Sequence, residues 1–115
     1  MAETDDHERG FWELAEPFLR ERPGVTRSTM MGLSCLRVDG AFFASCDRTS
    51  GALVLKLSEA RVDDLLEAGH AEAFSPAGRR FREWAAIPVV RRADWAALLE
   101  ESYQHVSRSS QRRQQ

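Results

Sequence analysis

Residues 33–57 constrain the fold of this chain most, because apolar and polar side chains alternate there with the period of a β-strand. Three such runs, LSCLRV, AFFASC and ALVLKL, are separated by turn residues. The pair Asp39 and Gly40 joins the first two runs. Asp-Gly favours a two-residue type I′ hairpin, since both central residues of that turn need a positive φ. The segment therefore predicts three consecutive antiparallel strands.

Helical periodicity appears on both sides of this segment. Apolar residues spaced i, i+3, i+4, i+7 and i+8 predict an amphipathic helix over residues 7–22, which Pro17 is expected to kink or split because it lacks a backbone N–H. Ser58, a favourable N-cap, and Gly69, a favourable C-terminal stop, predict a second helix between them. A further apolar stripe predicts a third helix that begins at Trp95.

Two more strands are predicted between the second and third helices, over residues 72–75 and 80–87, and Pro88 ends the latter. The polar, low-complexity segment 108–115 is predicted to be disordered. The order of elements is then α, three β, α, two β, α within a single domain, residues 1–107. We therefore expect an α+β fold, an α-β3-α-β2-α two-layer sandwich on an antiparallel sheet.

The composition fits one soluble domain. A chain of 115 residues with 43% hydrophobic and 30% charged residues is long enough to bury one core. The first ten residues, MAETDDHERG, contain no apolar signal region, and no run approaches the roughly 18 apolar residues of a membrane span. We therefore expect a cytoplasmic protein without a membrane partner.

Two cysteines flank the predicted hairpin turn. Regular pairing around this turn puts Cys35 and Cys46 at diagonal positions on the same face of the sheet, about 7 to 8 Å apart between Cα atoms, beyond the disulfide reach of about 6.8 Å. The two cysteines and three histidines do not have the spacing of a zinc site. We therefore expect free, buried thiols and no bound metal.

Catalytic motifs are missing from the sequence. GLSC at residues 32–35 begins like a nucleophile elbow but lacks the second glycine, and there is no dinucleotide-binding glycine motif or Walker A loop. Carboxylates such as Glu13 and Glu16 lie at helical spacing opposite an apolar stripe, as on a solvated helix face. We therefore expect no enzymatic activity and no cofactor.

Strand alternation assigns side chains to the two faces of the predicted sheet. The face toward the helices, together with helix residues, is predicted to form the core: Leu36, Val38, Phe43, Leu53, Leu55, Leu57, Phe81, Ala85, Ile87, Phe11, Leu14, Phe18, Leu65, Leu66, Leu98 and Leu99. The opposite face, which we call the outer face, is predicted to hold Arg37, Phe42, Lys56, Arg80, Arg82 and Trp84, with Arg91 and Arg92 nearby. The outer face is thus expected to mix cations with aromatic rings.

Three interpretations of the outer face are open. Such a surface can track phosphates and stack bases, in which case Arg80, Arg82 and Trp84 carry a salt-dependent contact with nucleic acid. Residues 78–95 carry five arginines against two acids, although the net charge of the chain is −2. The same face can form a homodimer or bind another protein, with Phe42 and Trp84 as anchors. Alternatively, guanidinium groups simply cover the aromatic rings of a half-solvated sheet.

Several motifs resemble one family in their order along the chain. They are Met30-x-Gly32, the glycine hairpin followed by an aromatic residue and alanine, the LKL strand with its helix, the strand containing Trp84, and the closing W..LLEESY. Over residues 10–106 the chain resembles the MmcQ/YjbR-like family and, more distantly, the N-terminal domain of the TfoX/Sxy competence regulators. The resemblance implies an α-β3-α-β2-α fold similar to secretion chaperones, and members are often labelled DNA-binding by association. We therefore expect a non-enzymatic DNA-binding or regulatory module or, alternatively, a protein-interaction module.

Overall fold

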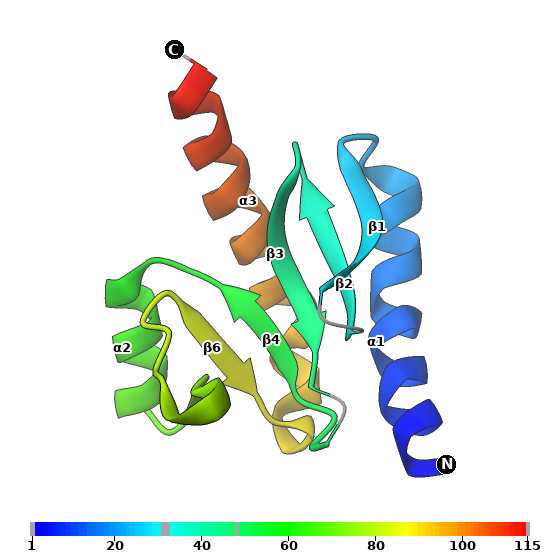
Figure 1. Ribbon diagram of the computed structural model, residues 1–115, viewed down its shortest axis with the longest axis vertical. Helices are drawn as coiled ribbons and strands as arrows, with labels where there is room; N and C mark the ends of the chain where they lie inside the picture. The colour runs from blue at the N-terminus through cyan, green and yellow to red at the C-terminus, as the bar shows by residue number, and fades with distance from the viewer. Residues whose placement is uncertain (1, 31–32, 48, 115) are drawn as a thin grey trace.

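A six-stranded antiparallel sheet with strand order β1-β2-β3-β4-β6-β5 organises the computed structural model, which describes residues 2–30, 33–47 and 49–114 (Figure 1). The strands are β1 (Val25–Met30), β2 (Leu33–Val38), β3 (Ala41–Cys46), β4 (Leu53–Lys56), β5 (Glu72–Ala73) and β6 (Trp84–Ile87). The helices are α1 (Ala2–Glu21), α2 (Glu59–Glu67) and α3 (Trp95–Gln114), with short 3₁₀ turns η1 (Pro76–Gly78) and η2 (Val89–Asp94). The α+β class is confirmed.

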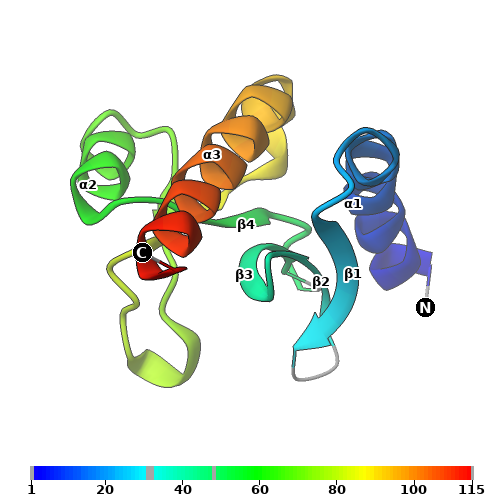
Figure 2. The same cartoon turned by 90° about the horizontal axis from the view of Figure 1, so that it is seen from above.

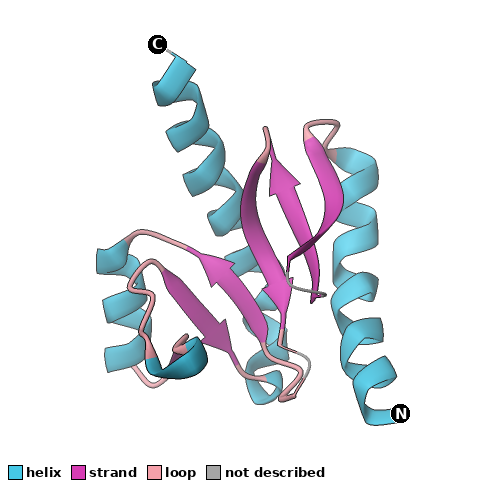
Figure 3. Cartoon of the chain, in the orientation of Figure 1, coloured by secondary structure: helices cyan, strands magenta, loops and turns pink. Residues whose placement is uncertain are grey.

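The three α-helices lie on one side of the sheet, as the view from above shows (Figure 2). The segment that joins β5 to β6, which contains η1, projects on the opposite side (Figures 2 and 3). We call this side of the sheet the outer face, and none of the α-helices in the described part of the chain covers it. An α+β unit of two layers results, in which the α-helices cover one face of the sheet.

The predicted hairpin between β2 and β3 is confirmed, with an irregularity. Asp39 (φ 52°) and Gly40 (φ 83°) both adopt positive φ angles, as a type I′ turn requires. The register shifts between Leu36 and Arg37, so Leu36 pairs with Ala44 and not with Phe43 as predicted. Because this bulge inserts one extra residue, Phe43 and Ala44 both belong to the core.

Strand β1 was not among the predicted elements, so the observed order is α-β4-α-β2-α. Its sequence, VTRSTM, contains β-branched residues but has no clear apolar alternation, and Val25 is buried while Thr26, Arg27 and Thr29 are exposed. An edge strand of this kind gains its stability from the ladder with β2, which runs from Val25 to Met30. Of the Met30-x-Gly32 motif, residues 31 and 32 lie outside the described part of the chain.

α1 is one continuous helix although Pro17 lies inside it, so the predicted split is wrong. Pro17 cannot donate to the carbonyl of Glu13, but both residues are exposed. Water can therefore bond to that carbonyl on the solvent side of the helix, which removes much of the cost of the proline.

α3 extends to Gln114, so residues 108–114 are helical instead of disordered as predicted. Buried side chains from Trp95 to Val106 anchor the first part of this helix on the sheet. Arginine and glutamine have good helix propensity, and an existing helix is extended at little cost. The polar composition that suggested disorder is therefore compatible with the end of an anchored helix.

The predicted core is largely confirmed. Its members are buried or packed against the buried cluster, with the exception of Phe81, which is 39% exposed. The cause lies in the length of the last strand: β6 covers Trp84–Ile87 only, and residues 79–83 lie outside any strand, with a turn at Arg82 and Glu83. Strand alternation therefore does not apply before Trp84, and the predicted placement of Phe81 with the core is wrong.

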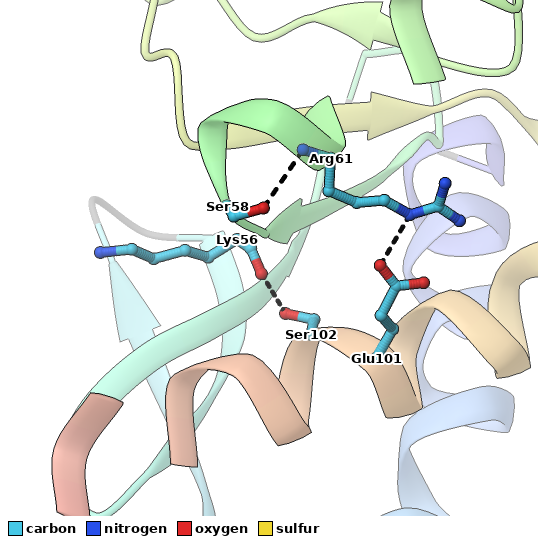
Figure 4. A network of polar contacts seen from close by, with 5 residues as sticks. All are labelled: Lys56, Ser58, Arg61, Glu101 and Ser102. Carbon is cyan, nitrogen blue, oxygen red and sulfur yellow. Dashed lines mark hydrogen bonds and ion pairs between the residues drawn. The ribbon is translucent and has the colours of Figure 1, made fainter. Parts of the chain in front are cut away.

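Polar contacts connect α3 to the sheet and to α2 (Figure 4). The hydroxyl of Ser102, which is fully buried, lies 2.9 Å from the carbonyl oxygen of Phe43 and 2.7 Å from that of Lys56. Arg61 of α2 donates through Nε to Glu101 of α3 at 2.7 Å. These contacts hold both helices against the middle strands.

Candidate interaction face

A cluster of three aromatic rings lies beside the outer face. Phe74 lies 6.0 Å from Phe81 and 6.4 Å from Trp84 between ring centroids; we call these three residues the aromatic cluster. Phe74 and Trp84 pack against a small buried group on the outer face, Ala52, Val54 and Ala86, which is separate from the main core. The main-chain bonds from Phe81 N–H to Phe74 (2.9 Å) and from Trp84 N–H to Phe81 (3.1 Å) fix the loop that carries the rings.

Arg37 and Phe42 also lie on the outer face, as the sequence predicts. They are directly paired in the β2–β3 ladder, and the guanidinium carbon of Arg37 lies 4.3 Å from the centroid of the Phe42 ring. This distance is within the range of a cation–π interaction. The Nε of Arg37 is buried and has no hydrogen-bond partner among the described residues, so the stacking on the Phe42 ring orients this side chain.

Arg80 and Arg82 do not join Trp84 on the outer face, which corrects their predicted placement. Arg80 donates to Asp63 of α2 at 3.2 Å, and Arg82 lies 3.9 Å from Glu59 of the same helix. Because residues 79–83 lie outside the strand, strand alternation does not direct these side chains, and they reach the α2 side of the sheet edge. Their charges are therefore compensated by two acidic residues that follow the N-cap of α2.

Arg91 and Arg92 lie on η2, next to the start of α3. Arg91 donates through Nε to Asp94 at 3.1 Å. The guanidinium carbon of Arg92 lies 5.6 Å from the centroid of Trp95, and a Cβ placed on Gly10 of α1 would come within 3.3 Å of this guanidinium. Both arginines therefore hold local structure on the helical side and do not extend the outer face.

The two cysteines lie on opposite faces of the sheet and not on the same face as predicted. Cys35 pairs with Ser45 on the outer face, whereas Cys46 belongs to the main core, because the bulge shifts the register by one residue. Both are buried, and neither is in a disulfide. Burial raises the pKa of the Cys35 thiol, while the Arg37 charge and a hydrogen bond with Ser28 act in the opposite direction.

This pKa shift predicts a loss of stability in alkaline solution. A thiol whose pKa is higher in the folded than in the unfolded state contributes stability that is complete below the unfolded pKa and is lost as the pH rises above it. The free energy of unfolding should therefore decrease more steeply in the natural chain than in Cys35→Ala as the pH rises above the ordinary thiol pKa of about 8.5. Urea unfolding of both at a series of pH values measures this difference, and equal slopes would contradict the shift.

Other chemistry is limited among the described residues. No three His, Cys, Asp or Glu side chains within 2–30, 33–47 and 49–114 are grouped so that they could hold a metal ion. In the same part of the chain, no helix has the length and the apolar composition needed to cross a membrane.

The sequence prediction missed Phe74 and Phe81 as members of the outer surface. Phe74 follows a two-residue strand and Phe81 lies in the loop before β6, so neither has an alternation pattern around it. The signal that could have found them is local. Two phenylalanines and a tryptophan lie within eleven residues around Pro76 and Gly78, where a turn brings them together.

Comparison with known proteins returns no matching family model, no matching curated protein and no matching solved structure. The resemblance to the MmcQ/YjbR-like family therefore stays a prediction.

Proposed function

We propose that this chain is a non-enzymatic protein-interaction module that binds a second copy of itself through the outer face. The observation that carries the proposal is the aromatic cluster, in which Phe81 is 39% exposed beside a sheet face without a helical layer. Large aromatic side chains next to a polar rim are typical anchors of protein interfaces. A two-fold axis that lies in the plane of the interface, parallel to the outer face, would bring two such clusters together.

The charge distribution favours this function over nucleic-acid binding. Three of the arginines expected to contact phosphates, Arg80, Arg82 and Arg91, have carboxylate partners within 4 Å. Binding to phosphates would require those ion pairs to break. On the outer face itself, Arg37 is stacked on Phe42 and Lys56 lies 3.9 Å from Glu83. Beside the aromatic cluster, the guanidinium carbon of Arg79 lies 5.7 Å from the centroid of the Phe81 ring.

Regulation by DNA binding, which the family resemblance implies, is the second candidate. The specific feature in its favour is the stacked pair Arg37 and Phe42, because Arg37 has no carboxylate partner among the described residues. A guanidinium on an aromatic ring can contact a phosphate and a base together. A single pair gives a weak, salt-dependent contact.

Truncation of Trp84 tests self-association. Trp84→Ala should weaken the dimer by about 2 kcal/mol or more, roughly 30-fold in Kd, because it removes an anchor of the interface. Sedimentation velocity over a range of protein concentrations measures this change. Since Trp84 also packs on Val54, Phe81→Glu provides a second variant that alters an exposed ring.

Val90→Glu is the matched control, because Val90 is 89% exposed on η2, outside the outer face. It should leave the sedimentation profile unchanged. A natural chain that is monomeric at all concentrations would reject the dimer. Retention of a fluorescein-labelled 20-base-pair duplex at low salt, lost in Arg37→Ala, would favour the second candidate instead.

A further inference from the structure

Two exposed charges flank the aromatic cluster on the outer face. Glu72 of β5 is paired with Ala86, which belongs to the outer-face group. Directly paired residues of neighbouring strands point to the same side of a sheet, so Glu72 lies on the outer face. Arg79 belongs to the loop between β5 and β6, and its guanidinium carbon lies 5.7 Å from the centroid of the Phe81 ring. An acid and a base therefore border the same group of aromatic rings.

Neither of these two charges is compensated within the described part of the chain. Glu72 and Arg79 are both exposed, and neither forms an ion pair with another described residue. The neighbouring cation on this face differs, because Lys56 lies 3.9 Å from the carboxylate of Glu83. Glu72 and Arg79 are therefore the charges at this end of the face that can pair with a second molecule.

The two charges lie at opposite ends of the aromatic cluster. Phe74 comes two residues after Glu72, about 7 Å further along the strand direction and toward the loop. Phe81 is joined to Phe74 by a main-chain hydrogen bond (2.9 Å) and belongs to the loop, as does Arg79. The order from strand to loop is then Glu72, Phe74, and Phe81 with Arg79. This loop projects on the outer side of the sheet, where a second molecule can reach it (Figures 2 and 3).

Two outer faces can pair in two orientations, which differ in the direction of the two-fold axis. An axis parallel to the strands places Glu72 beside Glu72 of the second copy, and Arg79 beside Arg79. An axis across the strands exchanges the two ends of the cluster, so each Glu72 meets Arg79 of the second copy. Like charges in contact oppose the first orientation, and opposite charges favour the second.

We propose that Glu72 and Arg79 determine the orientation and specificity of the dimer by forming two symmetric ion pairs between the copies. This inference rests on the proposed self-association through the outer face. Each copy offers both an acid and a base around its aromatic rings, so the surface is complementary to itself. Exposed ion pairs add little affinity, and their effect is instead to fix the register and to exclude partners that present like charges.

Reversal of either charge tests the proposal. Glu72→Arg and Arg79→Glu each convert both ion pairs of the dimer into like-charge contacts, so each should weaken association at least about tenfold in Kd. Sedimentation velocity at low salt, over a range of protein concentrations, measures the change. The matched controls are Glu13→Arg and Arg20→Glu, which make the same charge changes at exposed positions of α1 and should leave Kd unchanged.

A mixture of the two variants provides the decisive measurement. In a mixed dimer the introduced arginine meets the introduced glutamate, and the natural pair forms on the other side of the axis. Fluorescein-labelled Glu72→Arg should therefore associate with Arg79→Glu about as tightly as the natural chain associates with itself, although neither variant does so alone. The double variant Glu72→Arg/Arg79→Glu should likewise dimerise. Recovery in the mixture also shows that both single variants are folded.

The possible outcomes separate this proposal from the proposed dimer. If the natural chain dimerises and both single variants do so equally well, the ion pairs are wrong while the dimer stands. If both single variants are monomeric and neither the mixture nor the double variant associates, the pairing of Glu72 with Arg79 is also wrong. A natural chain that is monomeric at all concentrations would overturn the dimer and the ion pairs together.

Discussion

Replacing Phe43 with alanine is expected to lower the free energy of unfolding by about 3 to 5 kcal/mol. Phe43 is fully buried at the bulge of β3. Its ring lies 6.1 Å from that of Phe18 on α1 and 6.0 Å from that of Tyr103 on α3, between centroids. Its removal would leave a cavity where both long helices meet the sheet. Urea unfolding followed by circular dichroism measures the loss.

Phe42→Ala is the matched control, because the neighbouring phenylalanine lies on the outer face and is only half-buried. Its loss should be about 1 kcal/mol, since less apolar surface returns to water. The difference between the two variants depends on the bulge, which sends adjacent residues to different environments. Equal losses would show that the bulge is misplaced.

Leu55→Ala is expected to cost about 2 to 5 kcal/mol. Leu55 is fully buried in the central strand β4, where it pairs with Ala44 on one side and Ala85 on the other. Two small neighbours cannot fill the space that a shortened side chain would leave. The same urea titration gives the value.

Val90→Ala serves as the control for Leu55→Ala, since Val90 is 89% exposed. An exposed substitution of this kind should change the free energy of unfolding by less than about 0.5 kcal/mol. A loss below this level in Leu55→Ala would mean that Leu55 points to the outer face of the sheet instead of the core.

Sequence patterns predicted the elements that have strong local signals. The Asp39 and Gly40 turn, the N-cap at Ser58 and the apolar face of α3 each depend on a few neighbouring residues, and each is present in the structure. β1 could not be found in this way. A polar edge strand is stabilised by its hydrogen bonds to β2. These bonds join residues of two different strands, so they leave no periodic pattern in the sequence of β1 itself.

The candidate site was predicted less well for a related reason. Strand alternation predicted that Arg80 and Arg82 lie on the same face of the sheet as Trp84. This alternation holds only within a strand, however, and β6 begins at Trp84. Arg80 and Arg82 instead form ion pairs with Asp63 and Glu59 of α2, beside the edge of the sheet. By contrast, Arg37 and Phe42 were placed correctly because they pair next to the turn, before the bulge changes the register.

The unequal lengths of the two sheet edges also determine which assemblies this chain avoids. Pairing the β1 edge of one molecule with the β5 edge of the next would be a head-to-tail contact, which repeats without limit and produces a filament. β5 offers two residues to such a contact, against six in β1. So short an edge cannot hold a growing fibril, and the β5 end of the sheet therefore stops head-to-tail polymerisation.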